Sequence, residues 1–164
     1  MLQPHLTPEK NSSIDALIRR AAFDVLAQRE HSQQELTEKI IRKFKKRTDV
    51  VVTEDRIAEV VSAINAEGLQ SNTRYIEMLI RSRINQGHGP MRIAQELKQK
   101  GIPSAEYESL LDSRSEEWLE RAKQAKQKKF GIAKTIDQKE KGRQLRFLQY
   151  RGFSSQQIQF AMKS

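Results

Sequence analysis

Few residues of this chain could do chemistry, and their spacing matches no catalytic or metal-binding pattern. Its three histidines, His5, His31 and His88, are far apart in the sequence, and the chain contains no cysteine. A metal site needs several ligands that converge, and an activated nucleophile needs a base beside it. Glu96 has no visible partner carboxylate on its helix. We therefore expect no catalytic residue, no metal ligand and no cofactor.

Basic side chains are the chemically active groups that remain. The formal net charge is +9, and it is unevenly distributed. Residues 1–68 hold 11 basic and 11 acidic residues, residues 69–115 hold 7 and 5, and residues 116–164 hold 12 and 5. A localised basic surface favours a polyanionic partner, either nucleic acid or an acidic protein groove. A solvated, solubilising face is the alternative.

The candidate partner-binding residues form two sets, whose guanidinium and ammonium groups could follow an anionic partner. In the alternative interpretation their alkyl stems only cover apolar neighbours while the charges stay in water. Phe147 and Tyr150 lie among the C-terminal arginines and could stack on bases, although we expect them to pack in the core. The middle set is Arg81, Arg83, Arg92, Lys98 and Lys100, and the C-terminal set is Arg143, Arg146 and Arg151.

Short amphipathic helices must position these side chains, and residues 80–107 show the pattern most clearly. A helix ends at Gly87, and Gly87 and Gly89 are expected to take left-handed conformations in a tight turn around His88. Pro90 suits the first position of the next helix, which carries an apolar stripe and ends before Gly101. A third helix follows, so this segment predicts a three-helix unit.

Similar patterns cover most of the chain. The expected helix starts are Ser12 or Ser13, Ser32 with Glu35 in a capping box, Thr53, Ser71 or Asn72, Ser115, and Ser154 or Ser155. Residues 1–12 are interpreted as a flexible tail and residues 132–141 as a polar connection. Polar composition, with 37% hydrophobic and 31% charged residues, favours small stacked units over one deep core.

An internal repeat is the strongest pattern in the sequence. The segment from Lys100 to Tyr107 aligns without gaps to the segment from Arg151 to Ile158, with Leu97 and Leu148 four residues before the aligned glycines. We therefore predict an all-α, elongated array of three tandem three-helix repeats, at residues 13–69, 70–113 and 114–164.

A helix-turn-helix DNA reader is a second interpretation of three short helices. Residues 90–100 would then be the recognition helix, with Arg92, Gln95 and Lys98 exposed. Repetition of the unit favours a stacked scaffold instead. No leader is recognisable, and no apolar run approaches the ~18 residues of a membrane span. We expect a soluble, cytoplasmic, monomeric protein without membrane contact.

Several motifs resemble the RecX family over residues 14–162. The central ones are Gly68-Leu69, Tyr75, Arg81-Ser82-Arg83, Gly87-His88-Gly89-Pro90, Arg92-Ile93, Gln95-Glu96-Leu97 and Lys100-Gly101-Ile102. Leu26-Ala27, Arg29, His31-Ser32 and Glu35-Leu36 resemble the family's first repeat, and residues 147–153 its third. Gln70-Ser71-Asn72 departs from the acidic residues expected after Leu69.

The resemblance implies a small all-helical modulator of the RecA recombinase. Such proteins bind RecA and its filaments on single-stranded DNA, with weak contact to DNA, and typically suppress ATPase, strand-exchange and co-protease activity. The consequence would be regulation of DNA repair and of the SOS response. A DNA-binding protein that acts without RecA is the alternative, and an enzyme is a distant third.

Overall fold

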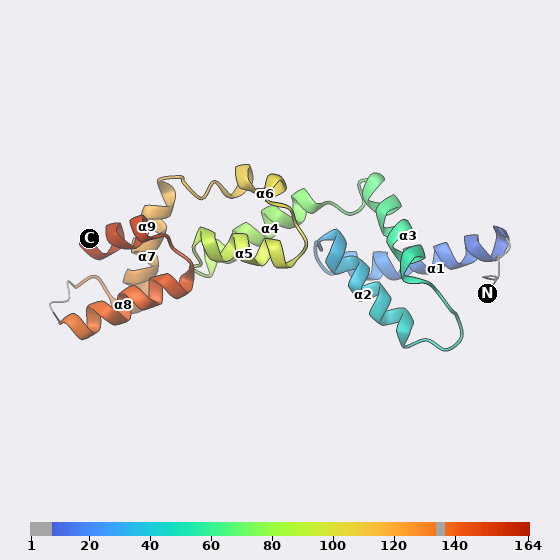
Figure 1. Cartoon of the computed structure of the whole chain (residues 1–164), viewed down its shortest axis with the longest axis horizontal. Coiled ribbons are helices and arrows are strands. Elements are labelled where there is room, and N and C mark those ends of the chain that lie inside the picture. The colour runs from blue at the N-terminus through green and yellow to red at the C-terminus, as the bar shows by residue number, and fades with distance from the viewer. Residues whose placement is uncertain (1–7, 134–136) are drawn as a thin grey trace. The chain divides into compact units, whose positions relative to one another are not determined.

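A computed structural model describes residues 8–133 and 137–164 (Figure 1). Throughout these two ranges the regular secondary structure is α-helical and no strand is present, so the expected all-α class is confirmed. The helices in the described residues are α1 (Pro8–Leu26), α2 (Gln33–Lys45), α3 (Glu54–Ala66), α4 (Asn72–Asn85), α5 (Pro90–Gln99), α6 (Ser104–Leu111), α7 (Glu117–Phe130), α8 (Gln138–Arg151) and α9 (Ser155–Lys163).

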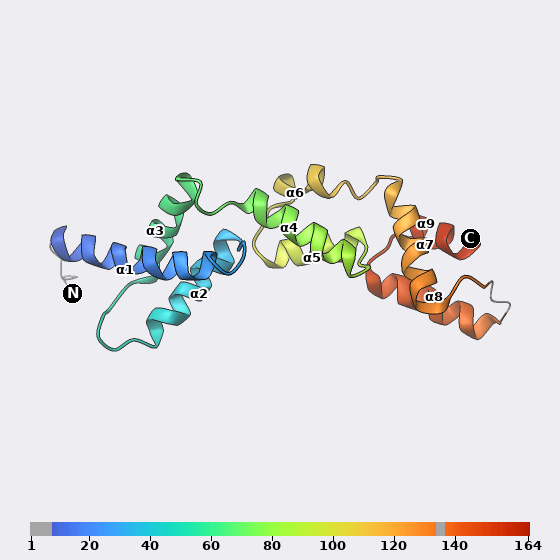
Figure 2. The same cartoon turned by 180° about the vertical axis from the view of Figure 1, so that it is seen from behind.

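The chain divides into two compact units, residues 1–75 and residues 76–164. In the first unit, α1, α2 and α3 pack against one another, and Figure 2 shows α1 crossing in front of the other two helices. Their apolar stripes meet in one core, as helical spacing requires. The buried members are Ile18, Ala21, Ala22, Leu36, Ile40, Phe44, Ile57, Val60, Val61 and Ile64.

The second unit contains the two C-terminal three-helix groups. Helix α5 packs against α6, and α7 packs against both α8 and α9. The two groups therefore share one compact unit rather than forming two isolated domains. Their buried apolar residues include Ile76, Leu79, Ile93, Leu97, Ile102, Tyr107, Leu111, Trp118, Ala122, Leu148, Phe153, Ile158 and Ala161.

The aligned segments of the internal repeat have the same backbone structure. The amide of Ile102 donates to the carbonyl oxygen of Leu97 at 3.1 Å, and the amide of Phe153 donates to Leu148 at 3.2 Å. These bonds close the ends of α5 and α8, and Gly152 takes the left-handed conformation there, with φ +88°. The repeated sequence therefore forms the same helix-ending hydrogen bond in both places, which confirms the tandem arrangement.

Several helix starts agree with their predicted caps. The Ser32 hydroxyl accepts the Glu35 amide at 3.1 Å, and Ser154 forms a complete capping box with Gln157. Helix α7 begins at Glu117, two residues after the expected start at Ser115. Such caps satisfy amides that the first helical turn leaves without a partner.

Two predicted non-helical segments were partly wrong. Helix α1 begins at Pro8, so residues 8–12 are helical; residues 1–7 of the predicted tail lie outside the described range. Within the predicted connection at 132–141, residues 134–136 also lie outside it, but α8 begins at Gln138. Asp137 caps this helix by accepting the amides of Lys139 and Glu140 at 3.2 and 3.3 Å.

A buried polar network joins two turns of the first unit. The Gln70 side chain donates to the carbonyl oxygen of His31 at 3.0 Å and to Asn72 at 3.1 Å. Its own oxygen accepts the Asn65 amide group at 2.8 Å. Gln70 and Asn72 are the residues that depart from the expected acidic pattern, and they supply neutral partners for this network.

Candidate partner-binding surface

Arg83 of the middle basic set is part of an internal ion pair. It leaves the last turn of α4, and two of its nitrogens donate to the Glu96 carboxylate on α5 at 2.7 and 2.6 Å. This hydrogen-bonded pairing holds the pKa of Glu96 below its usual range. The pair therefore fixes α4 to α5, and the Arg83 charge is largely balanced within the fold.

The turn that carries His88 lies against the end of α8. The Gly89 amide donates to the carbonyl oxygen of Arg151 at 2.7 Å, and the Met91 amide donates to Gly152 at 3.0 Å. An added Cβ at Gly89 would lie 2.4 Å from the Gly152 carbonyl oxygen. Gly89 has φ −86°, so the predicted left-handed conformation is wrong, and the residue is needed for close backbone approach.

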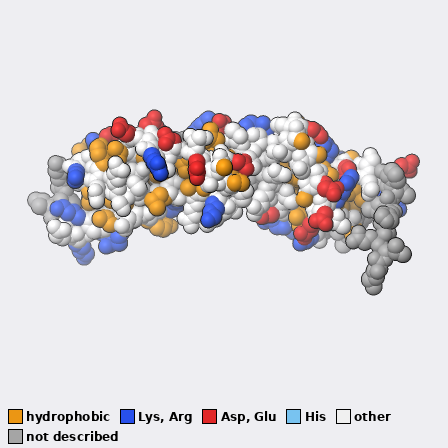
Figure 3. Space-filling model, turned by 45° about the horizontal axis from the view of Figure 1, so that its top comes forward, with side chains coloured by type: hydrophobic (Ala, Val, Ile, Leu, Met, Phe, Trp, Pro, Cys, Tyr) orange, Lys and Arg blue, Asp and Glu red, His pale blue; other side chains and the backbone are white. Residues whose placement is uncertain are grey.

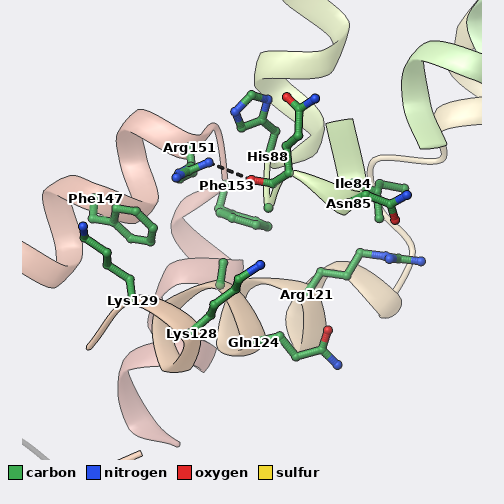
Figure 4. A pocket seen from close by; sticks show the side chains of 13 residues that line it. Ile84, Asn85, His88, Arg121, Gln124, Lys128, Lys129, Phe147, Arg151 and Phe153 are labelled. Atoms are coloured by element: carbon green, nitrogen blue, oxygen red, sulfur yellow. Dashed lines mark hydrogen bonds between the residues drawn. The ribbon is translucent and has the colours of Figure 1, made fainter. Parts of the chain in front are cut away.

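Arg92 and Arg151 complete this junction between the second and third helical groups. Arg151 donates to the carbonyl oxygen of Gln86 at 2.7 Å (Figure 4, dashed line), and its guanidinium lies 5.0 Å from the Phe147 ring. Arg92 donates to the carbonyl oxygen of Tyr150 at 3.2 Å and lies 4.9 Å from that ring. Both guanidinium groups are half-buried and have partners within the fold.

The two aromatic residues near these arginines differ in their surroundings. Phe147 is half-buried and meets Phe130 edge to face at 5.3 Å, as core packing predicts. Tyr150 is 74% exposed, so its predicted place in the core is wrong. Because Arg92 lies on its ring, Tyr150 presents a cationic and aromatic surface to solvent.

The remaining predicted residues differ in their exposure. Arg81, Lys98, Arg143 and Arg146 are exposed, and Lys100 is half-buried. Arg143 pairs with Glu140 at 3.0 Å within α8, a solvent-exposed pair that contributes little to stability. The eight predicted residues lie on α4, α5 and α8, with Lys100 at the end of α5.

His88 lies beside the junction and is not only a turn residue. Its Nδ1 atom is buried, and in the part of the chain that the structure describes it has no hydrogen-bond partner. Burial, followed by the charges of Arg92 and Arg151, lowers the pKa of His88. The ring is therefore neutral at pH 7.

Sequence reasoning missed the cationic pocket beside this junction. The pocket has a volume of about 490 Å³ and opens between the end of α4, α7 and α8 (Figure 4). Arg121, Lys128 and Lys129 on α7 face it together with Arg151. The lysine-rich run of α7 signalled the charge, but only the packing of α7 against α8 reveals the cavity.

Basic residues are concentrated in the second unit. Residues 76–164 contain 18 basic and 10 acidic residues, a net charge of +8, whereas residues 1–75 contain 12 and 11, a net charge of +1. On the face shown in Figure 3, Lys and Arg side chains are scattered among neutral and acidic ones. The excess charge thus belongs to one unit, and on the face shown it does not form a uniform patch.

No group of three or more His, Cys, Asp or Glu side chains within 8–133 and 137–164 is placed to hold a metal ion. Among the helices in those ranges, none is long and apolar enough to cross a membrane.

Comparisons with known proteins match this architecture. The family model for the second three-helix domain of RecX matches residues 71–111, and that for the third three-helix domain matches residues 115–162. A regulatory protein RecX of Halorhodospira halophila is 35% identical over 88% of this chain and 85% of its own length. One from Pseudomonas entomophila is 38% identical over 86% of each chain.

A solved crystal structure of a regulatory protein RecX has a similar fold. Its TM-score is 0.75 at 18% sequence identity, over 100% of this chain and 82% of that one. The fold and surface define a helical-repeat protein of tandem three-helix units with a basic C-terminal half. The sequence comparisons are more specific, and the chain belongs to the RecX family.

Proposed function

We propose that this protein binds RecA and RecA–single-stranded-DNA filaments and modulates, mostly by inhibition, their recombinase, ATPase and co-protease activities. It would thereby regulate DNA repair and the SOS response. The observation that carries the proposal is the similarity, over more than four fifths of both chains, to proteins named regulatory protein RecX. Their name describes a regulator.

The charge distribution supports the same proposal. A nucleoprotein filament is polyanionic, and a unit with a net charge of +8 is attracted to such a surface. We place the contacts on the exposed members of the predicted sets: Arg81, Lys98, Arg143 and Arg146. Arg83, Arg92 and Arg151 would act indirectly, by holding the second and third helical groups together.

We also propose the repeat boundaries 13–69, 70–113 and 114–164, with α1 extending the first repeat back to Pro8. The family matches at 71–111 and 115–162 support the second and third repeats. Each repeat contributes three helices, so contacts to a partner would be distributed along the chain.

The test is a titration of RecA ATP hydrolysis on preformed single-strand filaments, at low and at moderate salt. A helical protein of equal net charge, unrelated in sequence, serves as the control. We expect inhibition at substoichiometric concentrations that persists at moderate salt, with the control inactive. Equal inhibition by both proteins, limited to low salt, would instead identify a DNA-binding protein that acts without RecA.

A further inference from the structure

The pocket between α4, α7 and α8 has the size of a specific binding site. Its volume of about 490 Å³ is enough for a large side chain together with the backbone that carries it. Phe153 and Ala125 contribute apolar surface to its wall, and Phe153 is only 3% exposed. All the residues that line it belong to the compact unit of residues 76–164.

The rim of the pocket is cationic and lacks balancing acids. Arg121, Lys128, Lys129 and Arg151 line it, and no Asp or Glu is among the described residues that do. Arg121 is paired outside the pocket with Glu117 at 3.1 Å, and Arg151 is bound to a backbone carbonyl. Lys128 and Lys129 are exposed on the last turns of α7, and Figure 4 shows them at the side of the opening.

The aromatic geometry argues for a peptide rather than a nucleobase. Base recognition by stacking needs an open ring face. The Phe147 ring has Arg151 over it at 5.0 Å and Phe130 against it at 5.3 Å, while Phe153 is buried. An apolar side chain can still insert against these rings, and carboxylates beside it would reach the two lysines.

We propose that this pocket binds an acidic peptide segment of a protein partner, with one apolar side chain inserted and its flanking carboxylates paired to Lys128 and Lys129. This inference rests on the proposed function, because it requires a protein partner. It goes further by specifying the chemistry of the partner segment that is bound. Arg121 and Arg151 shape the opening, and the lysines supply the ionic contacts.

The probe is a fluorescent peptide of Glu and Asp residues around a single Phe, followed by polarisation against the full chain. Two companion peptides replace the acids by their amides or the Phe by Ala. We expect the acidic Phe peptide to bind, and each companion to bind about tenfold more weakly, because both ionic and apolar contacts are required. An oligo(dT) strand of equal charge is titrated in parallel.

The decisive variant is K128E/K129E, because both side chains are exposed and their replacement should leave the fold intact. We expect it to weaken peptide binding about tenfold. The control K139E/K163E makes the same charge change at exposed positions that do not line the pocket, and should alter binding less than about twofold. A125M, which fills the cavity without changing charge, should also weaken binding.

Two outcomes would overturn the inference. Equal losses of peptide binding in K128E/K129E and K139E/K163E would show non-specific attraction. A nucleic-acid contact would be identified if K128E/K129E weakened the binding of oligo(dT) as strongly as it weakened peptide binding. Far-ultraviolet circular dichroism and thermal melting confirm that each variant is folded. No RecA is present in this assay, so its failure would leave the ATPase test of the proposed function unaffected.

Discussion

The side chain of His31 is completely buried between one hydrogen-bond acceptor and one donor, and these two partners fix its protonation state. Its Nδ1 lies 2.8 Å from the carbonyl oxygen of Arg29, and its Nε2 lies 2.9 Å from the Lys39 ammonium nitrogen. A carbonyl oxygen can only accept and an ammonium can only donate. The ring is therefore the neutral tautomer with its proton on Nδ1.

This geometry predicts a stability that falls in mild acid. Burial, above all, lowers the pKa of His31, and the charges of Arg29 and Lys39 add to the shift. The hydrogen bond to the Arg29 carbonyl and, more weakly, the charge of Glu35 oppose it. The unfolded chain then binds a proton more readily than the folded one, so the free energy of unfolding decreases as pH drops below the unfolded value of about 6.5. Urea unfolding at pH 7.5 and 5.5 measures the loss.

His88 has a lowered pKa as well, so the wild-type slope contains two histidine contributions. The variant H31Q removes one of them and should show a smaller decrease between the two pH values. An unchanged slope in H31Q would contradict the proposed titration of His31.

Gln70 offers a second prediction about one residue. The variant Q70A removes the donor to the His31 carbonyl oxygen and the acceptor of Asn65. Because buried polar groups lose their partners, we expect a loss of about 1–3 kcal/mol in the free energy of unfolding. The exposed Gln159 provides the matched control, since Q159A should change stability by less than about 0.5 kcal/mol. Similar effects in urea titrations would show that the network contributes little.

The helices themselves were predictable because their starts and ends depend on neighbouring residues. Ser32 caps α2 through an amide three positions away, and the bond from Phe153 to Leu148 closes α8 five positions back. The roles of Gly89 and Arg151 were not predictable from such patterns. Each depends on a partner about sixty residues distant in sequence, and local periodicity carries no information about that pairing.

The same contrast applies to the candidate surface. The sequence alone gives the charge count, so the excess of basic residues in the C-terminal third can be read from it directly. Whether an arginine is available to a partner depends on the groups that pack beside it. Arg92 and Arg151 donate hydrogen bonds to backbone carbonyl oxygens. The start of α8 at Gln138 was missed because its first turns are polar and lack an apolar stripe.

At the level of helix packing, the turn before α5 makes a close backbone contact with the end of α8. In G89A the new methyl group would meet the Gly152 carbonyl within 2.4 Å, so backbone must move. We expect a loss of about 1–3 kcal/mol in the free energy of unfolding, as for other overpacked sites. The matched control is G142A inside α8, where the nearest atom is the flexible end of Arg146 at 3.4 Å.

G142A should stabilise the protein by about 0.5–1 kcal/mol, since alanine favours a helix interior over glycine. Thermal melting of the two variants compares one methyl group at a packed junction with one on an open helix. Equal effects of the same sign would show that Gly89 and Gly152 are not in close contact in solution.

For the molecule as a whole, the distribution of charge separates two possible modes of binding. The unit of residues 76–164 has a net charge of +8, against +1 for residues 1–75, although both units carry many exposed basic side chains. Total charge alone would make reversals equally harmful in either unit. If RecA instead contacts a specific surface, the location of a reversed charge should matter more than the number of reversed charges. The second unit is the candidate for that surface, because acidic residues in the first unit already balance its basic residues.

Two triple variants with the same change in net charge test this distinction. One is K98E/R143E/R146E in the second unit, and the other is R20E/R42E/K46E in the first; all six side chains are exposed. Under the proposed function, the second-unit triple should raise the concentration needed to inhibit RecA about tenfold or more, and the first-unit triple only a few fold. Equal losses would assign inhibition to net charge, whereas a larger loss in the first-unit triple would move the RecA-binding surface to residues 1–75. The second-unit triple leaves Lys128 and Lys129 unchanged, so it does not remove the ionic contacts proposed for the cationic pocket.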